Sequence, residues 1–88
     1  FAHDEELKFK VSSRRNKYLG QWVSHKLGYD ELKEKDYIQS VIKADFQEAG
    51  DEDVFKKIKE DLKNQNVSDE DIRNKMKEFD EKAKTDFI

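Results

Sequence analysis

The chain has 88 residues, of which 34% are hydrophobic and 44% are charged, and it contains no proline and no cysteine. This length allows one small domain with a modest core, and the abundance of Lys, Glu and Leu without β-branched runs predicts an all-α fold. The formal net charge of −3 argues against general nucleic-acid binding, which needs a basic face, and the absence of cysteine excludes disulfides and thiol chemistry.

The first predicted helix covers about residues 4–27 and is interrupted only by an isolated Gly20. At about 1.5 Å per residue it would be roughly 35 Å long, which is longer than the other predicted helices. In its first half Leu7 and Phe9 lie roughly 200° apart around the helix axis, so apolar side chains lie on two sides. A helix cannot bury two such sides against its own bundle. We therefore expect this half to insert between surfaces of another protein.

The second and third predicted helices are shorter and amphipathic. The second covers about residues 32–49 and stops at Gly50. The third begins at Asp51, whose carboxylate can cap the first free amides. The apolar positions at helical spacing in all four predicted helices indicate which residues face the core. They are Tyr18, Leu19, Trp22, Val23, Leu27, Tyr37, Ile38, Val41, Ile42, Phe46, Val54, Phe55, Ile58, Leu62, Ile72, Met76, Phe79, Ala83 and Phe87.

The fourth predicted helix has the strongest start signal. A polar turn at residues 64–66 precedes Ser68, which forms a pattern like a capping box with Asp71 three residues later. Val67 can pack onto Ile72 from the residue before the cap. The apolar spacing continues to about residue 86.

These segments predict a four-helix bundle with a long N-terminal helix that projects beyond it. We expect one helical domain over residues 1–88, in which residues 1–17 form a partner-binding arm and the start of the first helix. Residues 18–88 then form the bundle. The chain shows no long heptad seam, so we expect a monomer when it is free.

No set of residues predicts catalysis, and neither a metal nor a cofactor is expected. His3 and His25 lie at opposite ends of one helix, and residues 51–53 lack the glycine and the distal Glu of a calcium loop. None of the serines has the surroundings of a nucleophile elbow, and no glycine-rich phosphate loop is present. The sequence therefore does not predict an enzyme.

The charges of the first helix permit two interpretations. Acidic residues at the helix start and basic residues after them can form solvated pairs four positions apart, such as Asp4 with Lys8. Alternatively, Arg14 and Arg15 orient the helix against an acidic partner surface while Phe1, Leu7 and Phe9 serve as apolar anchors, because aromatic residues and Arg are frequent binding hot spots.

Several strings, in order along the whole chain, resemble the alphaproteobacterial zeta subunit, the small ATPase inhibitor of ATP synthase. They are Phe1-Ala2-His3-Asp4-Glu5-Glu6-Leu7-Lys8-Phe9-Lys10, Arg14-Arg15-Asn16-Lys17, Leu19-Gly20-x-Trp22, Lys43-Ala44-Asp45-Phe46, Glu48-Ala49-Gly50-Asp51-Glu52-Asp53-Val54 and Asp71-Ile72-Arg73-x-Lys75-Met76.

The resemblance implies an inhibitory N-terminal arm that wedges into a catalytic interface of the ATP synthase head, formed by its alpha, beta and gamma subunits, and blocks ATP hydrolysis. In that family further residues precede the Phe1 string, and residues 1–10 correspond to the C-terminal end of the inhibitory region. The candidate partner-binding residues are Phe1, His3, Asp4, Glu5, Leu7, Phe9, Lys10, Arg14 and Arg15.

The resemblance also implies a place in the cell. We expect a cytoplasmic protein, peripheral on the cytoplasmic face of the inner membrane through ATP synthase. No apolar run approaches the roughly 20 residues needed to cross a bilayer, so direct membrane insertion is not expected. The alternative function is a small helical binding module whose bundle binds a nucleotide or another protein.

Overall fold

The computed structural model describes the backbone of residues 2–47 and 52–87 and the side chains of residues 5–45 and 52–87. This part of the chain forms four helices and no strand: α1 (Ala2–Leu27), α2 (Glu31–Gln47), α3 (Glu52–Asp61) and α4 (Asp69–Asp86). The predicted all-α, four-helix fold is confirmed. The predicted helix stop at Gly50 and cap at Asp51 lie outside the described residues.

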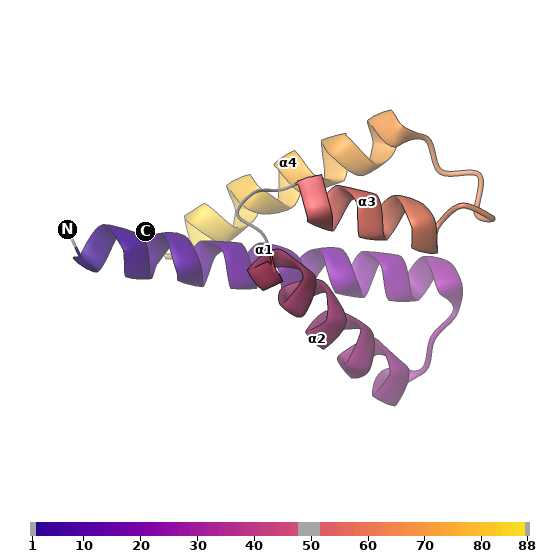
Figure 1. Ribbon diagram of the computed structural model, residues 1–88, viewed down its shortest axis with the longest axis horizontal. Helices are drawn as coiled ribbons and strands as arrows, with labels where there is room; N and C mark the ends of the chain where they lie inside the picture. Colours follow the sequence, from indigo (N-terminus) through magenta and orange to yellow (C-terminus); the bar gives the residue numbers. More distant parts are fainter. Residues whose placement is uncertain (1, 48–51, 88) are drawn as a thin grey trace.

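Helix α1 is the spine of the molecule (Figure 1). It packs against α2 on one side and α4 on another, and α3 packs onto α2 and α4. The first turns of α1 extend past α2 and α3, and the end of α4 lies along the same side of the molecule. The molecule is therefore elongated, with extents of 42 × 28 × 24 Å.

The core lies where the second half of α1 meets the other three helices. Its buried residues come from all four helices, which confirms most of the predicted inward positions. Six predicted core residues are only partly buried: Tyr18, Trp22, Leu27, Ile42, Phe79 and Phe87. Trp22, Leu27 and Phe79 among them pack against the buried cluster from its rim, and the side chain of Phe46 is outside the described residues. The buried cluster consists of Leu19, Val23, Tyr37, Val41, Val54, Phe55, Ile58, Leu62, Ile72 and Met76.

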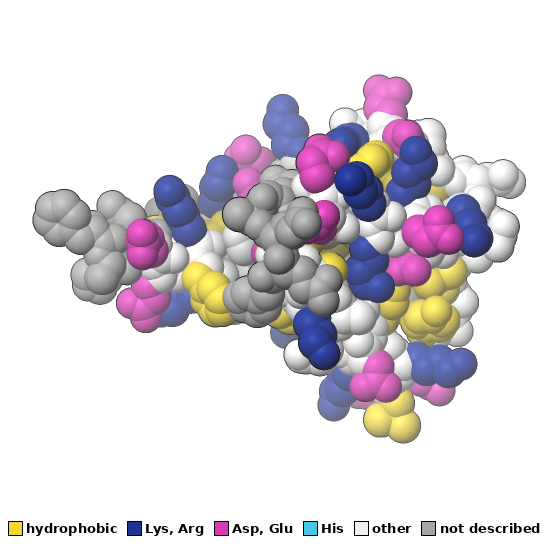
Figure 2. Space-filling view, viewed as in Figure 1, with side chains coloured by type: hydrophobic (Ala, Val, Ile, Leu, Met, Phe, Trp, Pro, Cys, Tyr) yellow, Lys and Arg dark blue, Asp and Glu magenta, His cyan; other side chains and the backbone are white. Residues whose placement is uncertain are grey.

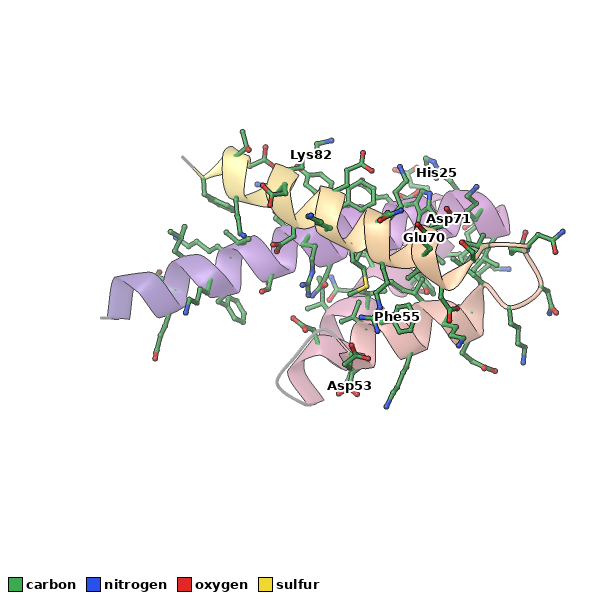
Figure 3. The ribbon with its side chains drawn as sticks, turned by 90° about the horizontal axis from the view of Figure 1, so that it is seen from above. His25, Asp53, Phe55, Glu70, Asp71 and Lys82 are labelled. Carbon is green, nitrogen blue, oxygen red and sulfur yellow. The ribbon has the colours of Figure 1, made fainter. Side chains whose placement is uncertain are left out.

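Two helix ends follow their local sequence signals. Gly28 has a φ of 73° after the last turn of α1, and the amide of Tyr29 donates to the carbonyl of Ser24 at 2.9 Å, as in a Schellman motif. At the start of α4, the amide of Asp71 donates to Ser68 Oγ at 3.1 Å. Figure 3 shows Asp71 in this first turn. The predicted end of the first helix at residue 27 and the predicted start of the fourth helix after Ser68 are both confirmed.

Helices α3 and α4 are joined by a cation–π contact as well as by their buried core residues. The guanidinium of Arg73 lies 3.7 Å from the ring centroid of Phe55, a geometry typical of a cation–π contact. The same arginine is 2.9 Å from the carboxylate of Glu52. These contacts hold the short α3 against α4, and so support the bundle from which α1 projects.

Helices α1 and α2 approach closely at Gly20. A Cβ atom at this position would lie 2.6 Å from Ile38 Cγ1 and 2.9 Å from Ile38 Cα. Because glycine lacks this atom, the two backbones can cross in direct contact. This crossing determines which residues of α2 lie next to the projecting half of α1.

Candidate functional site

The projecting half of α1 carries large apolar side chains that are exposed to solvent. Leu7 is 45% exposed and Phe9 is 52% exposed, whereas Val11, one helical turn further on, is buried. All side chains described between residues 5 and 10 are exposed. The bundle therefore buries this helix only from about Val11 onward.

Leu7 and Phe9 face two different grooves beside α1. Leu7 and Val11 line a groove of about 490 Å³ on the side where α4 ends. Phe9 lines a larger groove of about 770 Å³ between α1 and α2. Phe87, at the end of α4, contributes to both. The two apolar sides predicted for this helix thus open onto two separate surfaces, neither of which is filled by the described part of the chain.

The charges around these side chains are mixed. Glu5 and Glu6 are exposed, and Lys10 Nζ lies 3.8 Å from Glu6 Oε1 in a solvated pair four residues apart. The guanidinium of Arg14 lies 5.6 Å from the ring centroid of Phe87. Figure 2 shows charged and hydrophobic side chains side by side on this projecting part. Exposed pairs of this kind contribute little to stability, so they remain available to a partner.

Arg15 does not share this surface. Its side chain is only 4% exposed, and both Nε and a terminal nitrogen donate to Asn16 Oδ1, at 3.2 and 3.1 Å. A terminal nitrogen of Arg15 also lies 3.5 Å from Asp45 Oδ1, and Asn16 Nδ2 donates to Asp45 Oδ2 at 3.1 Å. The structure therefore separates Arg14, at the surface, from Arg15, which joins α1 to α2 in the interior.

The contact between α1 and the end of α4 is also polar. The Tyr18 hydroxyl donates to the Asp86 carboxylate, and this hydrogen bond raises the pKa of Tyr18 above its usual value. Lys82 Nζ lies 4.6 Å from the centroid of the Tyr18 ring, and Phe79 packs against that ring with the centroids 5.8 Å apart. These contacts fasten the end of α4 to α1 just behind the exposed residues.

Some of the expectations concern residues outside the described part, a metal site or a membrane span. The side chains of Phe1, His3 and Asp4 lie outside the described residues. Among the side chains that are described, no cluster of three or more His, Asp or Glu could hold a metal ion. Within the same part of the chain, the helices are too short or too polar to traverse a lipid bilayer.

Sequence reasoning missed the residues of α2 that complete this region. Asp45 is the counter-charge of Arg15, and Lys35, Ile38 and Ile42 line the groove opposite Phe9. Asp45 belongs to a string that supported the family resemblance, which was a signal of its importance. The spacing of Ile38 and Ile42 predicted that they face the core, but it did not predict the groove that they form with Phe9, because this groove depends on how α2 crosses α1.

The comparison with protein families gives one result that covers almost the whole chain. A family model described as ATPase inhibitor subunit zeta matches residues 1–86. The comparisons with curated proteins and with solved structures gave no match. The matched range includes all four helices and the projecting half of α1.

Proposed function

The chain belongs to the ATPase inhibitor subunit zeta family, and on this premise we propose that the projecting half of α1 is its inhibitory element. Family membership supports a regulatory role on ATP synthase. The finer proposal is that this half of α1 enters an interface of the catalytic head, made by the alpha, beta and gamma subunits, and blocks ATP hydrolysis. The protein then acts by binding and not by catalysis.

The observation that carries this proposal is the exposure of Leu7 and Phe9 on two sides of one helix beyond the bundle. An anchor on a single side would suit docking onto one surface. Anchors on two sides suit a helix that is enclosed between two surfaces, as in a subunit interface. Transfer of these side chains out of water would supply the hydrophobic part of the binding free energy.

The polar candidate residues would orient the helix once it is inserted. Glu5, Lys10 and Arg14 are at or near the surface of the same half of α1, where they can pair with charges of the catalytic head. Phe1, His3 and Asp4 extend the proposed contact toward the N-terminus. Arg15 contributes through its bond to α2, which holds the base of the projecting helix in place.

The proposal includes a location and an oligomeric state. An inhibitor of this kind works in the cytoplasm and is peripheral to the inner membrane through ATP synthase. A helix that enters an interface must be free at its end, so we propose that the unbound protein is a monomer.

The test is ATP hydrolysis by the purified catalytic head, titrated with the protein and with the double variant Leu7→Ala/Phe9→Ala. Both the 88-residue chain and a longer version with the residues expected before Phe1 are titrated. We expect the double variant to raise the concentration needed for half inhibition by about tenfold to a hundredfold, because two anchors are truncated.

Leu32→Ala is the matched control, because Leu32 is 75% exposed on α2 and lies outside the proposed arm. The double variant and the control should both remain folded at the assay temperature, which thermal melting checks, because Leu7 and Phe9 are each about half exposed and lie outside the buried core. Equal inhibition by the double variant would remove Leu7 and Phe9 from the proposal. If neither the 88-residue chain nor the longer version inhibits, the inhibitory role itself fails.

A further inference from the structure

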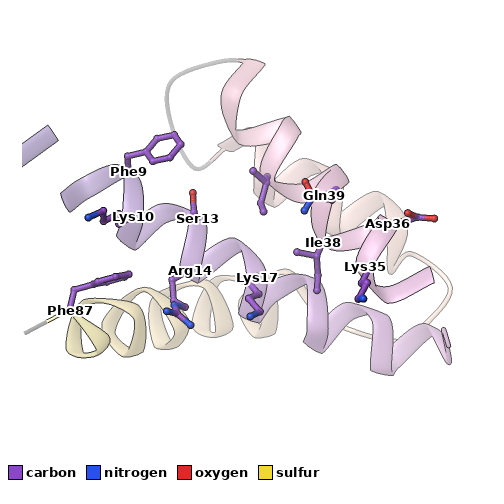
Figure 4. Close-up of a pocket in the computed structure, with 11 residues that line it drawn as sticks. Phe9, Lys10, Ser13, Arg14, Lys17, Lys35, Asp36, Ile38, Gln39 and Phe87 are labelled. Carbon is purple, nitrogen blue, oxygen red and sulfur yellow. The ribbon is translucent and has the colours of Figure 1, made fainter. Parts of the chain in front are cut away.

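The groove between α1 and α2 extends beyond the proposed inhibitory element into the bundle (Figure 4). Its volume is about 770 Å³, and it is lined on one side by α1 from Phe9 to Lys17 and on the other by α2 from Lys35 to Ile42. Nine residues of helix on the α1 side and eight on the α2 side give it a length of about 12 Å. It is therefore a furrow along two helices and not a closed cavity.

Positive charge is concentrated in this groove. Its described lining includes the cationic residues Lys10, Arg14, Lys17 and Lys35, and one carboxylate, that of Asp36. The chain as a whole has a net charge of −3, so the sign of the groove is opposite to that of the molecule. Lys17 and Lys35, which lie on opposite walls, are both exposed. Such a segregated patch attracts an acidic partner and orients it.

Apolar side chains lie between these cations. Phe9 is half exposed at one end of the groove, Ile42 is partly buried on the opposite wall, and Ile38 is buried where the helices cross. A small anion such as a phosphate would satisfy the cations and leave the apolar atoms in water. A helix with acidic residues beside an apolar stripe would match both.

We propose that this groove binds an acidic amphipathic helix, and that this helix belongs to the catalytic head. The second clause rests on the proposed function. The groove begins at Phe9, within the projecting half of α1, and continues onto α2, so one protein would make two connected contacts. Binding in the groove would hold the inhibitory helix at its interface at a high effective concentration.

The first experiment tests the groove without the catalytic head. The ¹⁵N-labelled protein is titrated with a designed peptide in which Leu is placed at helical spacing and Glu at the flanking positions. A second peptide has every Glu replaced by Lys, and inorganic triphosphate is a third probe. We expect the acidic peptide to shift the amide resonances of residues 9–17 and 35–42, and the basic peptide to leave them unchanged.

Two double variants with the same change of net charge make this test specific. Lys17→Glu/Lys35→Glu reverses the charge of one lysine on each wall of the groove. Lys43→Glu/Lys56→Glu reverses the charge of two exposed lysines that do not line the groove. We expect the first pair to weaken binding of the acidic peptide by about tenfold or more at low salt, and the second pair to change it by less than threefold.

Three results would overturn the proposal. One is the absence of resonance shifts in the groove with the acidic peptide. Another is equal binding by the two double variants. The third is a set of shifts in the groove with triphosphate but not with the acidic peptide, which would assign the groove to a small anion. Because the four reversed lysines are exposed, both double variants should keep the helical circular dichroism of the unmodified protein.

The same variants separate this proposal from the proposed function. We expect Lys17→Glu/Lys35→Glu to bind the catalytic head about tenfold more weakly, and Lys43→Glu/Lys56→Glu to bind it as the unmodified protein does. This result would show that the helix bound in the groove belongs to the catalytic head. Unchanged binding of the head by the first pair overturns the assignment to the head and leaves inhibition by α1 intact. If the protein does not inhibit ATP hydrolysis but still binds the acidic peptide in the groove, the inhibitory role fails and the groove remains.

Discussion

Arg15 and Asp45 form a largely buried ion pair between α1 and α2, in which Asn16 bonds to both. Asp45→Ala removes a countercharge 3.5 Å from a guanidinium that is only 4% exposed. We expect this change to lower the free energy of unfolding by about 1 to 3 kcal/mol, less than for a fully buried pair because Asp45 is itself 20% exposed. Urea denaturation measures the effect.

A double-mutant cycle then decides how Arg15 acts. Arg15→Ala and Asp45→Ala combined should cost less than the sum of the single changes, because both remove the same interaction. If Arg15 acts only through the bundle, the two single variants should also weaken inhibition of ATP hydrolysis equally. A much larger loss of inhibition in Arg15→Ala would instead indicate direct contact with the partner.

Tyr37 links α2 to α3 and makes stability sensitive to alkaline pH. Its hydroxyl donates to Asp61 Oδ2 at 2.6 Å. Burial, and then this hydrogen bond, raise the pKa of Tyr37 well above its usual value of 10.0. Above about pH 10 the unfolded chain releases this proton and the native protein keeps it, so stability present at neutral pH is lost as the pH rises.

We expect the free energy of unfolding to fall between about pH 9.5 and 11.5, by up to about 1.4 kcal/mol per pH unit from this group alone. Tyr37→Phe should be less stable at pH 7, because it loses the bond to Asp61, but its stability should depend less steeply on pH. Tyr18→Phe is the comparison variant: the Tyr18 hydroxyl also donates to a carboxylate, but Tyr18 is more exposed than Tyr37, so its removal should flatten the pH profile less. Parallel pH profiles for Tyr37→Phe and the unmodified protein would refute this assignment.

At the scale of the elements, the close crossing of α1 and α2 at Gly20 is the contact most sensitive to substitution. Gly20→Ala gains up to about 1 kcal/mol of helix propensity. Its Cβ would, however, meet the Cα of Ile38 at 2.9 Å, and a backbone atom cannot move aside without moving α2. We expect a net loss of about 1 to 3 kcal/mol, measured by urea denaturation.

Gly28→Ala is the natural comparison. A Cβ at Gly28 has no neighbour within 4 Å among the described residues, so its cost comes only from the φ of 73° and should be about 1 to 2 kcal/mol. Ile38→Ala removes the contact with Cγ1 but keeps those with Cα at 2.9 Å and Cβ at 3.2 Å. If Gly20→Ala has no stability cost when it is introduced into an Ile38→Ala background, the backbone contact is not the cause.

The helices themselves were predictable because their signals are local. Gly28 and Ser68 mark helix ends within a few residues, and the spacing from Ile72 to Met76 repeats one helical turn. The exposed Leu7 and Phe9 also followed from their angular separation on one helix. The approach of Asp45 to Arg15 did not, because it depends on the crossing of two helices, and no spacing within one helix encodes that crossing.

At the scale of the whole molecule, stability is distributed unevenly along α1. The described side chains of residues 5–10 are all exposed, whereas Leu19 and Val23 are completely buried in the core. Backbone hydrogen bonds in a helix without packing open at low free-energy cost, while those in the core open only with the whole fold. The backbone hydrogen bonds of α1 before Val11 should therefore open at a much lower free-energy cost than those after it.

Hydrogen exchange followed by NMR tests this gradient. We expect the amides of residues 6–10 to exchange orders of magnitude faster than those of residues 19–24, because only the latter require global unfolding. On binding to the catalytic head, the fast amides should become protected, since enclosure of the projecting half between two surfaces orders it and buries its anchors. Uniform protection along α1 in the free protein would show that the projecting half is already rigid. Unchanged exchange in the complex would show that the catalytic head does not enclose this half.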